Sequence, residues 1–137
     1  MTQHIVIRRE EFVAGTRDKP GSMVFTQTAI NRRPVPWGRI DTSDTVWVKW
    51  SGGPIVAKGI VDKVIQIENC TPKKLRKAVR GTLLHDLDAY WSSRPRSFFG
   101  MAIFCAEEQW LAQLIFPAAK GNMAGWIVLG NSEKEKA

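Results

Sequence analysis

Apolar and polar residues alternate along two neighbouring stretches near the middle of the chain, Asp44–Trp50 and Ile55–Glu68. Both stretches are rich in β-branched and aromatic residues, which favour strands. The segment between them, Ser51–Pro54, holds two glycines that reach positive φ without a Cβ clash and a proline that resists a central strand. This pattern predicts a β-hairpin.

The second arm of the hairpin carries a glycine, Gly59, in its interior. A glycine inside a strand is typical of a β-bulge or of a close approach by another backbone, as at the corner of a barrel. The arm is also too long to stay flat. We therefore expect a strongly curved hairpin at the centre of a small β-barrel.

Further strands are expected on both sides of the hairpin. Their apolar runs or alternating patterns cover Gln3–Arg8, Met23–Thr28, Phe98–Cys105 and Ala124–Leu129. The charged, glycine-containing stretch Glu10–Gly21 is expected to be a loop. Residues 29–42 contain two prolines and a glycine, which predict an irregular loop.

After the hairpin the apolar spacing becomes helical. Thr71 is a helix N-cap, Pro72 suits the first helical position, and Gly81 marks the end of that helix. Thr82 is expected to cap a second helix that ends near Trp91, and a third short helix is expected over Glu107–Leu114. Combined with the strands, these helices predict an α+β fold: a small mixed β-barrel with two or three short helices at its side.

The 137 residues, 44% of them hydrophobic, suffice for one domain with a real core. We expect a single domain over residues 1–130 and a flexible charged tail over residues 131–137. Cys70 and Cys105 have no paired spacing, so a reduced protein is the simpler interpretation and one disulfide is the alternative. The amino terminus has no signal-peptide pattern, and the longest apolar run is too short to span a bilayer. These features predict a cytoplasmic protein with no membrane partner.

The chain is basic and rich in tryptophan. Its net charge is +7, its pI is near 9.8, and it has six tryptophans. A basic surface favours polyanions, and a tryptophan face can stack on a base with a gain of roughly 1–3 kcal/mol. RNA or DNA is therefore the expected partner. Trp91, Trp110 and Trp126 fall on apolar stripes or strands and are expected in the core, whereas Trp37 either lines a pocket or caps the barrel end.

The helix that follows Thr71 is strongly basic. One interpretation is a solvated face; the other is contact with phosphates, which adds affinity and salt dependence without sequence choice. Arg94 and Arg96 extend this patch. The basic residues of the helix are Lys73, Lys74, Arg76, Lys77 and Arg80.

Residues for catalysis are few. His4 and His85 are the only histidines, and the sequence contains no P-loop, no G-x-S-x-G and no G-x-G-x-x-G motif. A metal site made from Cys70, His85 and Cys105 would need three scattered ligands without paired spacing. We therefore predict no catalytic residue, no metal and no cofactor.

The order of elements resembles the PUA-like superfamily, which includes the ASCH and EVE domains. The resemblance rests on the loop with Trp37, on Asp44-Thr-Val-Trp-Val at the entrance to a strand, and on Gly59-Ile-Val, and it covers Met23–Val64 well. Ser43 stands where these families often have a glycine before the aspartate. The resemblance implies a small barrel that recognises RNA or a modified base in a cleft, where a flipped base stacks on an aromatic ring.

By position, the resemblance places a base pocket at Asn31, Trp37, Trp50 and Ser51, with Arg32, Arg33 and Lys58 near phosphate. Two other functions remain open. Some ASCH proteins resemble amidohydrolases of modified cytidine, for which Lys19, Thr26 or Thr28, and Glu68 are candidates without a matching local motif. A protein-interaction domain is the third possibility.

Overall fold

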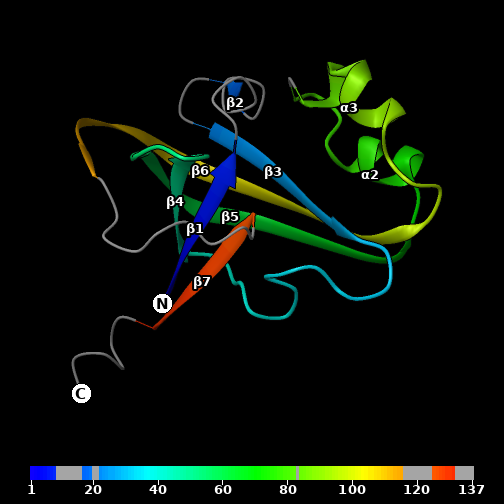
Figure 1. Ribbon diagram of the computed structural model, residues 1–137, viewed down its shortest axis with the longest axis horizontal. Coiled ribbons are helices and arrows are strands. Elements are labelled where there is room, and N and C mark those ends of the chain that lie inside the picture. The colour runs from blue at the N-terminus through cyan, green and yellow to red at the C-terminus, as the bar shows by residue number, and fades with distance from the viewer. Residues whose placement is uncertain (9–16, 20–21, 83, 116–124, 132–137) are drawn as a thin grey trace.

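The computed structural model describes residues 1–8, 17–19, 22–82, 84–115 and 125–131. Its strands form a seven-stranded sheet in the order β2-β3-β6-β5-β4-β1-β7 (Figure 1). Their bounds are β1 Thr2–Arg8, β2 Arg17–Lys19, β3 Ser22–Ala29, β4 Thr45–Trp50, β5 Ile55–Cys70, β6 Phe98–Ile115 and β7 Trp126–Asn131. The helices are α2 Pro72–Ala78, the 3-10 helix η1 Leu84–Asp86 and α3 Asp88–Ser92.

The predicted hairpin is confirmed as β4 and β5, paired antiparallel from Thr45↔Ile60 to Lys49↔Ile55. Gly59 marks a close approach, as expected, because a Cβ there would lie 2.8 Å from Met23 Cε and 3.2 Å from the Ala106 carbonyl oxygen. The sheet is mixed because β1 runs parallel to β4 while the other pairs are antiparallel.

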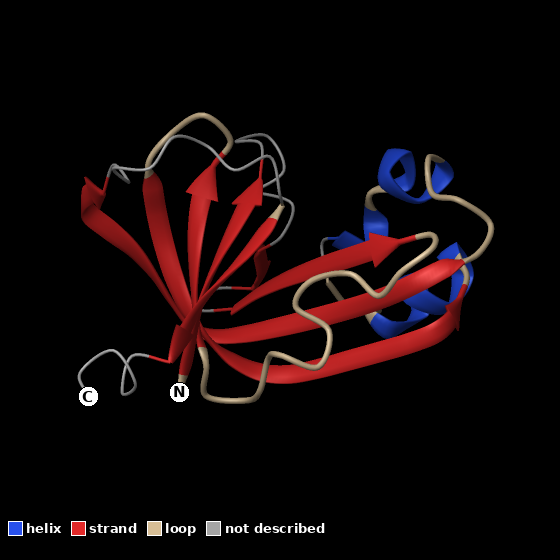
Figure 2. Ribbon diagram, turned by 60° about the horizontal axis from the view of Figure 1, so that its bottom comes forward, coloured by secondary structure: helices blue, strands red, loops and turns tan. Residues whose placement is uncertain are grey.

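The α+β class is confirmed, but the described strands do not close into the barrel that the sequence predicted. The edge strands of the sheet are β2 and β7. Figure 2 shows that β3, β5 and β6 extend to one side as a long arm that ends at the helices, while the strands on the other side fan out from one another. The arm is long because β5 has 16 residues and β6 has 18.

Two hydrophobic cores lie on opposite faces of β3, where successive side chains alternate. Phe25 belongs to the main core, which also contains Val46, Val48 and Trp126. Its neighbour Val24 belongs to the second core, where the helices pack with Leu75 and Trp91. The helices are therefore fixed to one face of the arm.

The first helix forms as predicted. Thr71 Oγ1 accepts a hydrogen bond from the Lys74 N–H at 3.2 Å, and Pro72 occupies the first helical position. The prediction of one continuous helix after Thr82 is wrong. Thr82 Oγ1 instead accepts from the His85 N–H and caps η1, and the non-helical backbone of Leu87 (φ −85, ψ 81) separates η1 from α3.

The predicted helix over Glu107–Leu114 is also wrong, because this stretch continues β6. Pairing with β5 places Trp110 opposite Ala57, and Glu107 adopts a positive φ of 52 where the register shifts. Trp110 is 39% exposed, so it is not a core residue, whereas Trp91 and Trp126 are buried as expected.

Two expectations fall largely outside the described residues. The loop expected over Glu10–Gly21 is described only at residues 17–19, which form β2, and the tail is described only at Asn131, in β7. The domain bounds therefore remain a prediction.

Cys70 and Cys105 are buried and free. Within the described part of the chain, no helix is long and apolar enough to cross a membrane.

Candidate nucleic-acid interface

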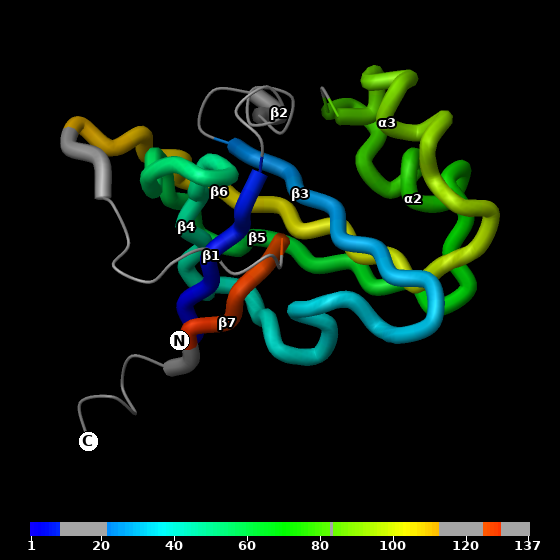
Figure 3. Tube along the Cα trace, in the orientation of Figure 1, coloured from blue at the N-terminus to red at the C-terminus, as the bar shows by residue number. Residues whose placement is uncertain are grey.

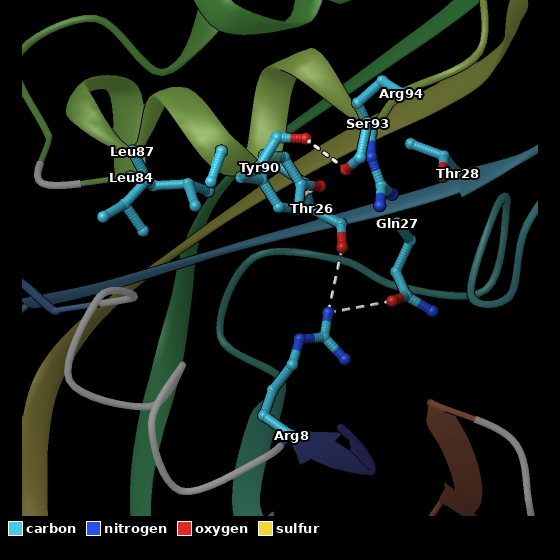
Figure 4. A pocket seen from close by; sticks show the side chains of 10 residues that line it. Arg8, Thr26, Gln27, Thr28, Leu84, Leu87, Tyr90, Ser93 and Arg94 are labelled. Atoms are coloured by element: carbon cyan, nitrogen blue, oxygen red, sulfur yellow. Dashed lines mark hydrogen bonds between the residues drawn. The ribbon is translucent and has the colours of Figure 1, made fainter.

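A cavity of about 360 Å³ lies between β3 and the helical segment, with Arg8 of β1 at its base (Figure 4). One wall is Thr26, Gln27 and Thr28 of β3. The other comes from η1, α3 and the residues around them: Leu84, Leu87, Ala89, Tyr90, Ser93 and Arg94. No carboxylate is among the lining residues that the structure describes, where two arginines supply the charge. We call this cavity the β3–α3 pocket.

Arg8 joins three parts of the fold at the base of the pocket. Its NH1 donates to the Ile7 and Gly125 carbonyls at 3.0 and 3.2 Å, and its NH2 donates to the Thr26 carbonyl and to Gln27 Oε1, both at 2.9 Å. Burial lowers the pKa of Arg8 to about 10, so the guanidinium is still charged at neutral pH. Arg8 thereby bridges β1 to β3, which do not pair in the sheet.

Tyr90 and Arg94 form the opposite side. The Tyr90 hydroxyl hydrogen-bonds to Thr26 Oγ1 and ties α3 to β3. The guanidinium of Arg94 lies 4.5 Å from the centroid of the Tyr90 ring, a cation–π contact. The Nε atom of Arg94 is buried and has no hydrogen-bond partner among the described residues. Figure 4 shows Arg94 directed toward Gln27, with Arg8 approaching from below.

Contacts within the helical segment hold α3 in place. Arg76 of α2 donates from Nε to the His85 carbonyl at 2.9 Å and from NH2 to Asp88 Oδ1 at 2.6 Å. The indole N–H of Trp91 donates to the Leu84 carbonyl at 3.0 Å, which fixes the turn between η1 and α3. Tyr90 packs edge-on against Trp91, with ring centroids 4.8 Å apart.

The exposed loop residues predicted to bind a base lie on the other face of the arm. Asn31, Arg32 and Arg33 are exposed, and Arg33 pairs with Glu68 at 2.8 Å. Trp37 is half-buried, packs against the main core and meets Phe99 edge-on at 6.0 Å. This packing matches the interpretation of Trp37 as a cap.

The other predicted pocket residues are distant from that loop. The loop returns from the end of β3 to the start of β4, whereas Trp50 and Ser51 lie at the far end of β4 (Figure 3). A strand from Thr45 to Trp50 spans roughly 17 Å. Lys58 on β5 pairs with Trp47 in the middle of β4, and its ammonium lies 5.3 Å from the centroid of the Trp47 ring. The structure therefore does not bring these residues into one pocket.

The basic helix α2 presents most of its charge to solvent. Lys73, Lys74, Lys77 and Arg80 are exposed, and Lys74 Nζ also donates to the Asn69 carbonyl at 3.2 Å. Arg76 is the exception, since its guanidinium is engaged with η1 and α3. The exposed cations lie on the same segment as the β3–α3 pocket.

The residues considered for an amidohydrolase are not assembled. Thr26 and Thr28 line the pocket on the helix face of β3. Glu68 contacts the loop on the opposite face, through Arg33, as does Gln66, whose Oε1 accepts from the Gly38 N–H. The side chain of Lys19 lies outside the described residues. No group of residues suited to a metal ion occurs in the described part of the chain.

Sequence reasoning missed Arg8, Gln27 and Tyr90 as site residues. Arg8 lies at the end of a strand, Gln27 lies within an alternating strand, and Tyr90 lies next to the buried stripe of a helix. Each local pattern is therefore typical of a structural residue and does not indicate a binding role. The sequence did indicate a binding role for Arg94, as an extension of the basic patch on the preceding helix.

Solved structures of an ASCH protein from Zymomonas mobilis resemble this chain along nearly its whole length. The protein itself gives a TM-score of 0.62 at 12% identity and covers 98% of this chain and 91% of its own. Two of its single-residue variants give TM-scores of 0.62 and 0.61 at 13% identity, covering 98% and 99% of this chain and 92% and 96% of their own. The fold is that of an ASCH domain.

This likeness confirms the PUA-like architecture expected from Met23–Val64. At such low identity it establishes the fold and not the activity. No protein-family model and no curated protein matches the sequence. The function is therefore inferred from the pocket and the charges of this chain.

Proposed function

We propose that the protein binds single-stranded RNA, holding one nucleotide in the β3–α3 pocket and the neighbouring phosphates on α2. The observation that carries this proposal is a pocket lined by two arginines and an aromatic ring, with no carboxylate among the described residues of its wall. Such a wall attracts an anion, while the pocket's leucines suit the apolar face of a base.

The charge around the pocket supports the same function. The exposed cations Lys73, Lys74, Lys77 and Arg80 precede η1 and α3 in the same helical segment. Cations on one surface contact phosphates without reading bases, so they add affinity for any strand whose nucleotide enters the pocket. The net charge of +7 acts in the same direction at longer range.

A single-residue block of the pocket tests this proposal. Ala89 lines the pocket from α3 and is exposed, so Ala89→Trp fills the cavity without removing a side-chain hydrogen bond. Ser92→Trp adds the same side chain to the same helix at a position that does not line the pocket. We expect Ala89→Trp to weaken binding of a short single-stranded RNA at least tenfold, about 1.4 kcal/mol.

Fluorescence anisotropy with a labelled RNA measures both variants against the wild type. Ser92→Trp should bind as the wild type does. Equal affinities for all three proteins would show that RNA does not enter the β3–α3 pocket.

A further inference from the structure

The two arginines of the β3–α3 pocket have different capacities for a ligand. Arg8 uses four of the five N–H donors of a guanidinium on carbonyl and amide oxygens of the protein. These bonds fix its position, and it acts on a ligand chiefly through its charge. Arg94 stacks on Tyr90, and its buried Nε has no hydrogen-bond partner among the described residues. Arg94 is therefore the arginine that is free to bind.

Nε is covered by protein atoms, so the terminal nitrogens of Arg94, which lines the pocket, are the groups that can donate to a ligand oxygen. The hydroxyl of Thr28 also lines the pocket and can donate to the same ligand group, whereas the Ser93 hydroxyl donates to the Tyr90 carbonyl at 3.0 Å. Leu84 and Leu87 form the apolar part of the wall. One end of the pocket thus suits an anion and the other suits a flat apolar ring.

The charge of the wall distinguishes between kinds of phosphate. Arg8 and Arg94 contribute two positive charges, and none of the described lining residues is acidic. A phosphate monoester carries about −1.5 to −2 at neutral pH, whereas each internal phosphate of a strand carries a single charge. The monoester therefore matches the wall more closely than an internal phosphate does.

We infer that the β3–α3 pocket recognises a nucleoside bearing a terminal phosphomonoester, with Arg94 donating to the phosphate. The cavity volume of about 360 Å³ lies at the lower end for small-ligand sites, so it suits one nucleotide. This inference rests on the proposed RNA-binding function and specifies what that site selects. The monoester can belong to a free nucleotide or to the 5′ end of an RNA.

The test compares phosphorylated and unphosphorylated ligands on the full chain. Calorimetric titrations use the four common nucleoside 5′-monophosphates and their nucleosides, and anisotropy uses one short RNA with either a 5′-phosphate or a 5′-hydroxyl. The variants are Arg94→Gln, Arg94→Lys and the control Arg39→Gln, which removes one charge at an exposed position in the loop before β4. Thermal unfolding of each variant checks that the fold is retained.

We expect the phosphomonoester to raise affinity at least tenfold, and Arg94→Gln to remove most of that gain. Arg94→Lys keeps the charge without the planar fork and should retain part of it, while Arg39→Gln should stay within about twofold of the wild type. Tighter binding of the phosphorylated RNA than of the free monophosphates identifies an RNA end as the ligand, and the reverse order identifies a free nucleotide. Both orders support the inference.

Equal affinity for phosphorylated and unphosphorylated ligands would overturn the inference, as would equal losses in Arg94→Gln and Arg39→Gln. If the RNA then still bound and Ala89→Trp still weakened it, the proposed function would stand while the phosphomonoester preference failed. If neither RNA nor nucleotides bound, both would fail together.

Discussion

Asp44 connects β1, the loop before β4 and, through His4, β7. Its carboxylate accepts hydrogen bonds from the Thr2 and Asp41 N–H groups at 3.0 Å and from His4 Nε2 at 3.0 Å. Nδ1 of His4 accepts from the Trp126 indole N–H at 3.1 Å, so the proton of this neutral imidazole is on Nε2. The three side chains are all buried. A polar network of this kind fixes one arrangement of the strands it joins.

Burial alone would raise the pKa of Asp44, but the hydrogen bonds from His4, Asp41 and Thr2 outweigh burial and hold it below its ordinary value. A lowered carboxyl pKa stabilises the fold above the unfolded value of about 3.9, and this contribution is lost as the pH falls through the folded value. Stability that depends on Asp44 is therefore present at neutral pH and lost in acid.

We predict that Asp44→Asn lowers the free energy of unfolding by about 1–3 kcal/mol at pH 7. The asparagine amide has one oxygen that can accept hydrogen bonds, where the aspartate carboxylate has two. Urea unfolding at pH 7 and at pH 3 measures this, and the gap between wild type and variant should narrow at pH 3. Asp41→Asn is the control, since that exposed residue contributes its backbone N–H and not its carboxylate. A gap that is the same at both pH values would contradict this account of Asp44.

At the scale of elements, the position of α3 depends on α2 through Arg76. The guanidinium bonds to the His85 carbonyl and to Asp88, and it lies 6.0 Å from the centroid of the Trp91 ring. Asp88 is 88% exposed, so the ion pair by itself contributes little. The carbonyl bond and the contact with Trp91 are the stronger part of this link.

We predict that Arg76→Ala speeds amide hydrogen exchange across residues 84–92 roughly 5- to 30-fold, which corresponds to about 1–2 kcal/mol of local stability. The variant should also weaken nucleotide binding, because Tyr90 and Arg94 are placed by α3. Lys77→Ala on the same helix is the control for the exchange measurement, since Lys77 is exposed and has no such contact. Unchanged exchange in Arg76→Ala would show that the second core alone holds α3.

The elements that could be predicted from the sequence are those with a strong local pattern. The hairpin, β1, β3, β7 and α2 follow from alternation, turn residues and the cap at Thr71. The second half of β6 was mistaken for a helix because Glu107–Leu114 has helical spacing, which pairing with the long β5 overrides. The open sheet was missed for a related reason, since local patterns do not reveal how far β5 and β6 extend.

The pocket was predictable only in part. Arg8, Thr26 and Tyr90 come from three elements that are distant in sequence, and tertiary contacts alone bring them together. The basic helix was visible from composition, and its exposed lysines lie on the segment that also walls the pocket. Trp37 was a candidate for the base pocket because loop tryptophans can stack on bases, but here it packs against the main core.

Across the whole molecule, charge and cavity meet on one side of the sheet. The pocket and the exposed cations of α2 belong to the helix face of the arm, whereas the loop with Arg33 and Trp37 covers the other face. An RNA bound on the helix face would contact about three to five cations there. Each phosphate contact on a single strand releases roughly 0.7 counterions, so these contacts make the affinity depend on salt.

The most direct test of RNA binding is the affinity of the wild-type protein for a short labelled single-stranded RNA between 50 and 200 mM salt. With three to five phosphate contacts, we predict that affinity falls roughly 20- to 100-fold over this range. Binding that is absent at low salt, or that does not change with salt, would contradict the account of a nucleotide held in the β3–α3 pocket beside the cations of α2.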